Sequence, residues 1–170
     1  TVSALSVLSG FAISAETALP SAETGSDAVE VPYSAFYAAD GAELSETEFD
    51  GITAAAYTNE TGYIEAEFEI KNAGTYAVSV KYRPLEGKGR DIEFGLSIDG
   101  KPFGDESENY SLPRTWKDDL TEREQDAQGN ELRSSQSEVY KWKTAVLRSF
   151  EAISDADSTV ELSAGKHTLR

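Results

Sequence analysis

Residues 62–82 read GYIEAEFEIKNAGTYAVSVKY, and this stretch decides the fold. From Ile64 to Ile70, apolar residues at every second position alternate with three glutamates. The alternation returns from Thr75 to Tyr82, where the apolar positions hold Tyr, Val, Val and Tyr, and residues 72–74 (Asn-Ala-Gly) read as a turn between the two runs. A period of two is typical of a strand with one buried and one exposed face, so the stretch predicts two strands joined by a turn.

The rest of the chain continues this pattern in short segments separated by turn residues. The dipeptide Asp99-Gly100 is a strong hairpin signal. No apolar period of a helix persists over the roughly 11 to 18 residues that a helix prediction needs. The sequence therefore predicts an all-β chain, an antiparallel β-sandwich or jelly roll. The further expected strands lie at 28–33, 91–98 (with Ile92, Phe94, Leu96 and Ile98 pointing inward), 141–147, 159–162 and 166–170.

The N-terminal residues 1–15, TVSALSVLSGFAISA, are apolar, small and uncharged. The run is too short to span a bilayer and fits the hydrophobic part of a signal peptide, with small residues near Ala15 as a cleavage point. A buried N-terminal helix is the alternative, which Gly10 and the serines weaken. Residues 16–28 are rich in Pro, Ser, Thr, Gly and acid and are expected to be a flexible linker, which leaves 29–170 as the folded module.

Both ends of the sequence suggest a fragment of an exported, extracellular protein. The sequence begins with Thr1 and contains no methionine, and residues 166–170 read as a C-terminal strand that is truncated. A neighbouring domain in the same longer chain is therefore an expected partner.

Charge and residue types limit the classes of function. The chain carries 31 acidic and 15 basic residues, for a net charge of −16, which favours solubility and opposes binding to nucleic acid or insertion into anionic membranes. With no cysteine, disulfides, thiolate metal sites and a cysteine nucleophile are excluded. His167 is the only histidine and is expected at an exposed position. A Ser-His-Asp triad would need it as the base, and the sequence contains no nucleophile-elbow motif, so we predict a non-enzyme.

Residues 104–140 form a polar insertion in which the alternation disappears. Insertions of this length are usually functional or disordered. Sugars present apolar faces ringed by hydroxyls, which proteins bind with aromatic rings and planar polar groups. The alternative is that the two tryptophans and the arginine–asparagine pair only hold the loop together and pin it to the sandwich. The candidate carbohydrate-binding residues are Tyr110, Arg114, Trp116, Asn130, Arg133, Gln136, Tyr140 and Trp142.

The order of these segments resembles a known fold family. It is similar to the galactose-binding-like jelly roll of family 6 and family 35 carbohydrate-binding modules, over about residues 29–170. The segments that carry this resemblance are 62–65, 73–76, 80–82, 98–101, Trp142 and 162–169. Residues 87–93, 114–116 and 126–136 bring the chain closer to a module at the N-terminal end of some bacterial extracellular solute-binding proteins of sugar ABC transporters.

The resemblance implies a non-catalytic module that binds a glycan or oligosaccharide through loop aromatics, here Trp116, Tyr140 and Trp142. A structural spacer with the same fold, or an accessory module of a secreted glycoside hydrolase, stays open. Related modules hold a structural Ca²⁺ with an acidic residue of the first strand, where Glu30 stands here. Because Pro32 interrupts that strand, the metal site is not carried over.

Overall fold

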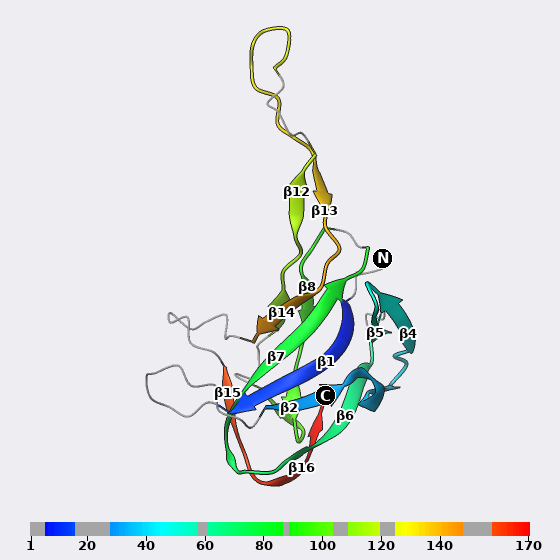
Figure 1. The fold of residues 1–170 in the computed structure, drawn as a ribbon, viewed down its shortest axis with the longest axis vertical. Helices are drawn as coiled ribbons and strands as arrows, with labels where there is room; N and C mark the ends of the chain where they lie inside the picture. The colour runs from blue at the N-terminus through cyan, green and yellow to red at the C-terminus, as the bar shows by residue number, and fades with distance from the viewer. Residues whose placement is uncertain are drawn as a thin grey trace.

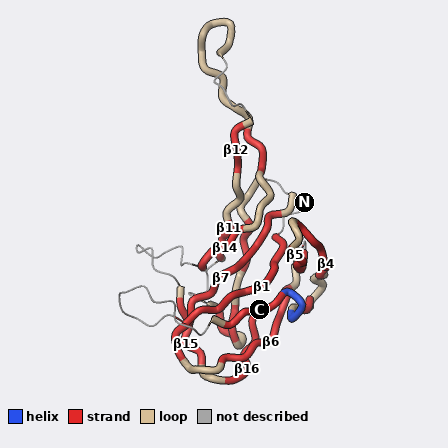
Figure 2. The backbone as a smooth tube through the Cα atoms, in the orientation of Figure 1, coloured by secondary structure: helices blue, strands red, loops and turns tan. Residues whose placement is uncertain are grey.

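The computed structural model describes residues 6–15 (backbone only), 28–57, 61–86, 89–103, 109–119, 125–147 and 158–170. Two antiparallel sheets face each other, and a long hairpin extends from one end of them (Figures 1 and 2). The helical content of the described residues is one 3-10 turn, η1 (Tyr33–Ala35). The prediction of an all-β sandwich is confirmed.

The larger sheet has the strand order β14-β7-β1-β5-β4, with β15 also paired to β7 and β2 also paired to β1. Its strands are β1 (Ser6–Ala15), β2 (Val29–Pro32), β4 (Leu44–Phe49), β5 (Ile52–Tyr57), β7 (Gly74–Pro84), β14 (Lys143–Val146) and β15 (Thr159–Leu162). The smaller sheet has the order β10-β9-β16-β6-β3. Its strands are β3 (Tyr37–Ala39), β6 (Tyr63–Ile70), β9 (Ser97–Ile98), β10 (Lys101–Pro102) and β16 (Gly165–Leu169).

Two short ribbons complete the described part. One pairs β8 (Ile92–Phe94) with β11 (Tyr110–Leu112), and the other pairs β12 (Trp116–Asp118) with β13 (Gln136–Glu138). The second ribbon forms the stem of the hairpin that leaves the sandwich (Figure 1).

The core lies between β6 and β7, the two strands predicted from residues 62–82. In β7 the alternate residues Tyr76, Val78, Val80 and Tyr82 are buried, and β6 contributes buried side chains from its C-terminal half. The exposed Glu67 and Glu69 alternate with them. Both strands and their inward faces are confirmed.

The expected single strand at 91–98 is wrong. The chain leaves the sheet geometry at Gly95 and Leu96, so β8 pairs with β11 while β9 joins the smaller sheet. A glycine inside a strand pattern commonly marks such a break. Ile92, Leu96 and Ile98 are still buried, whereas Phe94 is only half-buried.

The hairpin at Asp99-Gly100 is confirmed, and two more Asp-Gly turns occur. Asp99 and Gly100 both have positive φ (54° and 73°), as a type I′ turn requires. Asp40-Gly41 and Asp50-Gly51 repeat this conformation, and Asp50-Gly51 connects β4 to β5. The sequence carries the same dipeptide signal at all three places.

Residues 6–15 were expected to lie outside the fold, and the structure instead places them within the larger sheet as β1. This strand pairs antiparallel with β7, β2 and β5. A short apolar run fits both a signal peptide and a buried strand, because periodicity does not separate the two. Cleavage of the segment on export stays a prediction, and residues 16–27 of the expected linker lie outside the described residues.

His167 is buried, not exposed as expected. Its Nδ1 lies 2.7 Å from Asp99 Oδ2 and its Nε2 lies 2.8 Å from the Ser163 carbonyl oxygen. Both neighbours are acceptors, so both ring nitrogens act as donors when the imidazole is protonated. The charged His167 thereby joins β16 to the β9–β10 hairpin, where Asp99 also accepts from the Thr168 amide.

We expect this contact to make stability depend on pH. Burial by itself lowers the pKa of His167, but the bonds to Asp99 and Ser163 outweigh it and raise the pKa above 6.5. Since the folded state holds the proton more tightly, the gain is complete below about pH 6.5 and is lost as pH rises through the raised pKa. It amounts to about 1.4 kcal/mol per pKa unit. Urea unfolding from about pH 5 to pH 9 should show this loss, which His167→Gln should abolish.

Because the chain has one histidine, this transition is readily assigned. The ring nitrogen shifts of His167 in NMR spectra should titrate at the raised pKa, which is the upper end of the pH range over which the stability falls. A wild-type stability that stays level across this range would contradict the contact.

Among the described residues, none of the helical structure is long and apolar enough to span a membrane.

Candidate functional site

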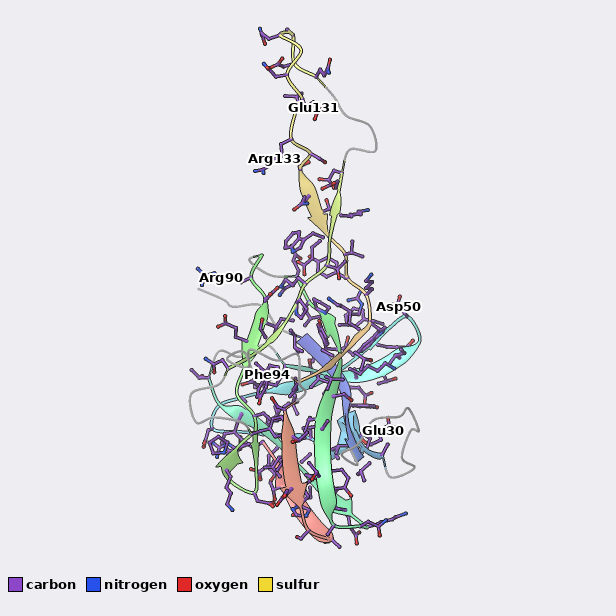
Figure 3. The ribbon with its side chains drawn as sticks, turned by 90° about the vertical axis from the view of Figure 1, so that its left-hand side faces the viewer. Glu30, Asp50, Arg90, Phe94, Glu131 and Arg133 are labelled. Carbon is purple, nitrogen blue, oxygen red and sulfur yellow. The ribbon has the colours of Figure 1, made fainter. Side chains whose placement is uncertain are left out.

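A hairpin arm, residues 116–138, projects from the sandwich. Its stem pairs β12 with β13 in the register Trp116–Glu138 and Asp118–Gln136, and an isolated bridge joins Gln125 to Glu131 further out. Most described residues of the arm are exposed. Figure 3 shows Glu131 and Arg133 on the arm, well away from the sandwich. Within the polar insertion predicted from the sequence, residues 116–118 and 136–138 therefore form a paired hairpin stem.

Hydrogen bonds within the arm give its tip a defined shape. Asp126 Oδ1 accepts from the amides of Gln128 (2.9 Å) and Asn130 (2.8 Å), and its Oδ2 accepts from Asn130 Nδ2 (2.9 Å). The side-chain bond from Asn130, followed by backbone bonds, lowers the pKa of Asp126. Nearer the stem, Gln136 Nε2 donates to Asp118 Oδ1. The side-chain amides of Asn130 and Gln136 thus donate hydrogen bonds within the arm itself.

A buried ion pair holds the base of the arm. The Arg114 side chain is fully buried and contacts Glu138, whose side chain is 6% exposed. Arg114 also donates from Nη1 to the Leu85 carbonyl (2.7 Å) and from Nε to the Arg90 carbonyl (2.6 Å). These bonds tie the last residue of β13 to the segment that follows β7.

Two exposed aromatic rings lie at this base. Trp116 is 41% exposed and Tyr140 is 37% exposed. Trp116 stands opposite Glu138 in the register, and directly opposite residues project to the same face of a ribbon. Burial, then the charge of Glu138 and its hydrogen bonding, raise the pKa of the Tyr140 hydroxyl. Glu138 therefore lies close to both rings.

Arg83 of β7 lies beside this base on the outer face of the larger sheet. Its guanidinium carbon lies 4.0 Å from the centre of the Phe49 ring and 5.8 Å from that of Tyr140. Its Nε lies 3.8 Å from Asp50 Oδ2, an ionic contact too long for a hydrogen bond. Among the described residues this buried Nε has no hydrogen-bond partner.

Trp142 lies on the same outer face of the larger sheet as Arg83. It is half-buried, packs with Phe49, Leu85 and two alanines of β5, and donates from Nε1 to the Phe49 carbonyl at 3.0 Å. Lys81 Nζ lies 5.7 Å from the centre of its ring. Since β14 and β4 stand at opposite ends of the strand order, this bond means that the sheet curls over its outer face. We call Phe49, Lys81, Arg83, Tyr140 and Trp142 the curled face.

The eight predicted residues thus separate into three groups. Tyr110 and Arg114 are buried, with the Tyr110 hydroxyl bonded to the Phe103 carbonyl, so these two are corrected to structural side chains. The arm carries Asn130, Arg133 and Gln136, and its base carries Trp116, Tyr140 and Trp142. The group on the arm and the group at its base do not form one cluster.

Sequence reasoning missed Phe49, Arg83 and Glu138. Arg83 and Lys81 occupy the outward positions of β7, a placement that its alternation already contained. Phe49 precedes the Asp50-Gly51 turn, which was a readable hairpin signal. Nothing local marks Glu138 as the partner of Arg114.

No group of three or more metal-ligating side chains occurs among the described residues, and Glu30 is exposed on β2. Comparison with protein-family models, curated proteins and solved structures finds no match for the chain.

Proposed function

We propose that this chain is a non-catalytic glycan-binding module of an exported solute-binding protein for sugar uptake. The resemblance in segment order supports the class of protein. The observation that carries the binding role is the pair of exposed rings, Trp116 and Tyr140, which lie close to Glu138 at the base of the arm. Exposed aromatic rings stack on the apolar C–H faces of sugars.

The curled face adds polar partners beside these rings. Arg83 supplies planar donors, and Trp142 supplies a further half-buried ring. Together the two surfaces offer aromatic and guanidinium groups of the kind that a glycan site uses.

Replacing Trp116 with alanine should weaken glycan binding about tenfold or more, because a stacked ring commonly acts as a binding hot spot. Titration of the chain against neutral and acidic oligosaccharides, followed by the fluorescence of its two tryptophans, measures this. Tyr37→Ala is the matched control, since it removes another exposed ring, on β3 of the smaller sheet. Equal losses in both variants would contradict a site at the arm base.

A structural spacer is the second candidate. The buried Arg114–Glu138 ion pair supports it, because this pair holds the base of an exposed arm that could pack against a neighbouring domain. Failure of every sugar to bind, together with reduced stability of the Trp116→Ala variant, would favour the spacer.

A further inference from the structure

We propose that the glycan bound at the curled face is anionic, with Arg83 pairing to a sugar carboxylate. This inference rests on the proposed glycan-binding function and names the class of its ligand. It concerns a sheet face, away from the hairpin tip where several of the predicted residues lie.

The first observation is the fixed orientation of Arg83. Its guanidinium lies against the Phe49 ring and near the Tyr140 ring, and its side chain is only 15% exposed. A guanidinium held against aromatic rings keeps its fork of donors in one plane, which matches a carboxylate better than a hydroxyl.

The second observation is that the charge of Arg83 is poorly compensated. The Asp50 side chain is 68% exposed and lies 3.8 Å away, and exposed pairs of this kind contribute only about 0–1 kcal/mol. The Arg83 Nε is buried and lacks a hydrogen-bond partner among the described residues, so Asp50 does not satisfy the guanidinium. A ligand carboxylate would instead pair with the terminal amino groups of this guanidinium and add the negative charge that the exposed Asp50 supplies only weakly.

The third observation is the local sign of charge. In a chain with a net charge of −16, β7 places Lys81 and Arg83 two residues apart on its outer face. Lys141 precedes Trp142, and its charge contributes to the lowered pKa of Lys143, of which burial is the main cause. Basic side chains beside the Trp142 ring favour an acidic sugar that stacks on an aromatic surface.

The test compares three ligands of one length: trigalacturonic acid, its methyl ester and neutral galactotriose. The ester keeps the shape of the acid and removes its charge. We expect the acid to bind at least tenfold more tightly than the ester at about 0.15 M salt, where the repulsion from those acidic residues that lie more than about 8 Å away is screened. Calorimetry or tryptophan fluorescence measures each affinity.

Two variants locate the effect. Arg83→Gln should remove the preference for the acid, and Arg83→Lys, which keeps the charge but not the fork, should retain only part of it. Arg90→Gln, at an exposed arginine that belongs to none of the candidate binding residues, is the matched control and should leave the preference unchanged. Urea unfolding of each variant verifies that it is folded.

The outcomes separate the two proposals. Binding of the neutral sugar or the ester as tightly as the acid would overturn the anionic ligand and leave the glycan-binding function standing. An acid preference that survives in folded Arg83→Gln would overturn the role of Arg83. Absence of binding for all three ligands and for a wider glycan set would overturn both.

Discussion

A chain that begins at residue 16 is expected to lose cooperative unfolding, because it lacks β1. This strand makes nine register pairs with β7, from Ser6–Pro84 to Ala15–Tyr76, and four with β2. Its removal leaves the backbone amides and carbonyls on both neighbours without partners. Each such buried group costs about 1–3 kcal/mol. The sum exceeds about 5 kcal/mol, the lower end of the total stability of a domain.

Circular dichroism and urea unfolding of the shortened chain measure this loss. A point variant gives a second test, since Ala12 pairs with both Glu30 and Ser79 and proline is poorly tolerated inside a central strand. Ala12→Pro should therefore destabilise the full chain. A shortened chain that unfolds like the full one would contradict the place of β1 and favour the signal-peptide interpretation.

Replacing Arg114 with methionine should lower the free energy of unfolding by about 3–5 kcal/mol. The variant leaves the Glu138 carboxylate buried without its cation and removes the donors to the carbonyls of Leu85 and Arg90. Urea unfolding of the folded chain gives the magnitude. Arg133→Met, an exposed arginine on the same arm, should change stability by less than about 0.5 kcal/mol.

The double variant Arg114→Met with Glu138→Leu tests the reason for this loss. It removes the uncompensated charge, so it should recover part of the stability lost in the single variant. If Arg114→Met costs less than about 1 kcal/mol but abolishes glycan binding, Arg114 acts on the ligand, and its assignment as a structural clamp is wrong.

The strands of the core could be predicted from the sequence because their signal is local. In β6 and β7 the alternation of apolar and polar residues indicates which side chains face the core. The dipeptide Asp99-Gly100 indicates a turn because its residues readily adopt positive φ. The prediction failed at residues 91–98, because the alternation continues across Gly95 while the backbone changes its pairing partner from β11 to β16.

The candidate site was predictable only in part. Trp116 and Tyr140 were found by residue type, as aromatic residues in a polar insertion, and both are exposed in the structure. Tyr110 and Arg114 have equally suitable side chains but are buried, and residue type does not report burial. Arg83 joins the curled face through Phe49, 34 positions earlier in the chain, a proximity that only strand pairing creates.

The sequence by itself determined the all-β class, the main core strands and the strong negative charge, since each follows from residue type and spacing. Only the tertiary structure decided that residues 6–15 form a strand of the larger sheet, that His167 is buried against Asp99, and that Arg114 clamps the arm. These features depend on partners 16 or more positions apart, with the Ser163 contact of His167 the exception. Backbone hydrogen bonds and ion pairs between residues this far apart produce no periodic pattern in the sequence. Their free energy is gained only when the fold brings the two partners together.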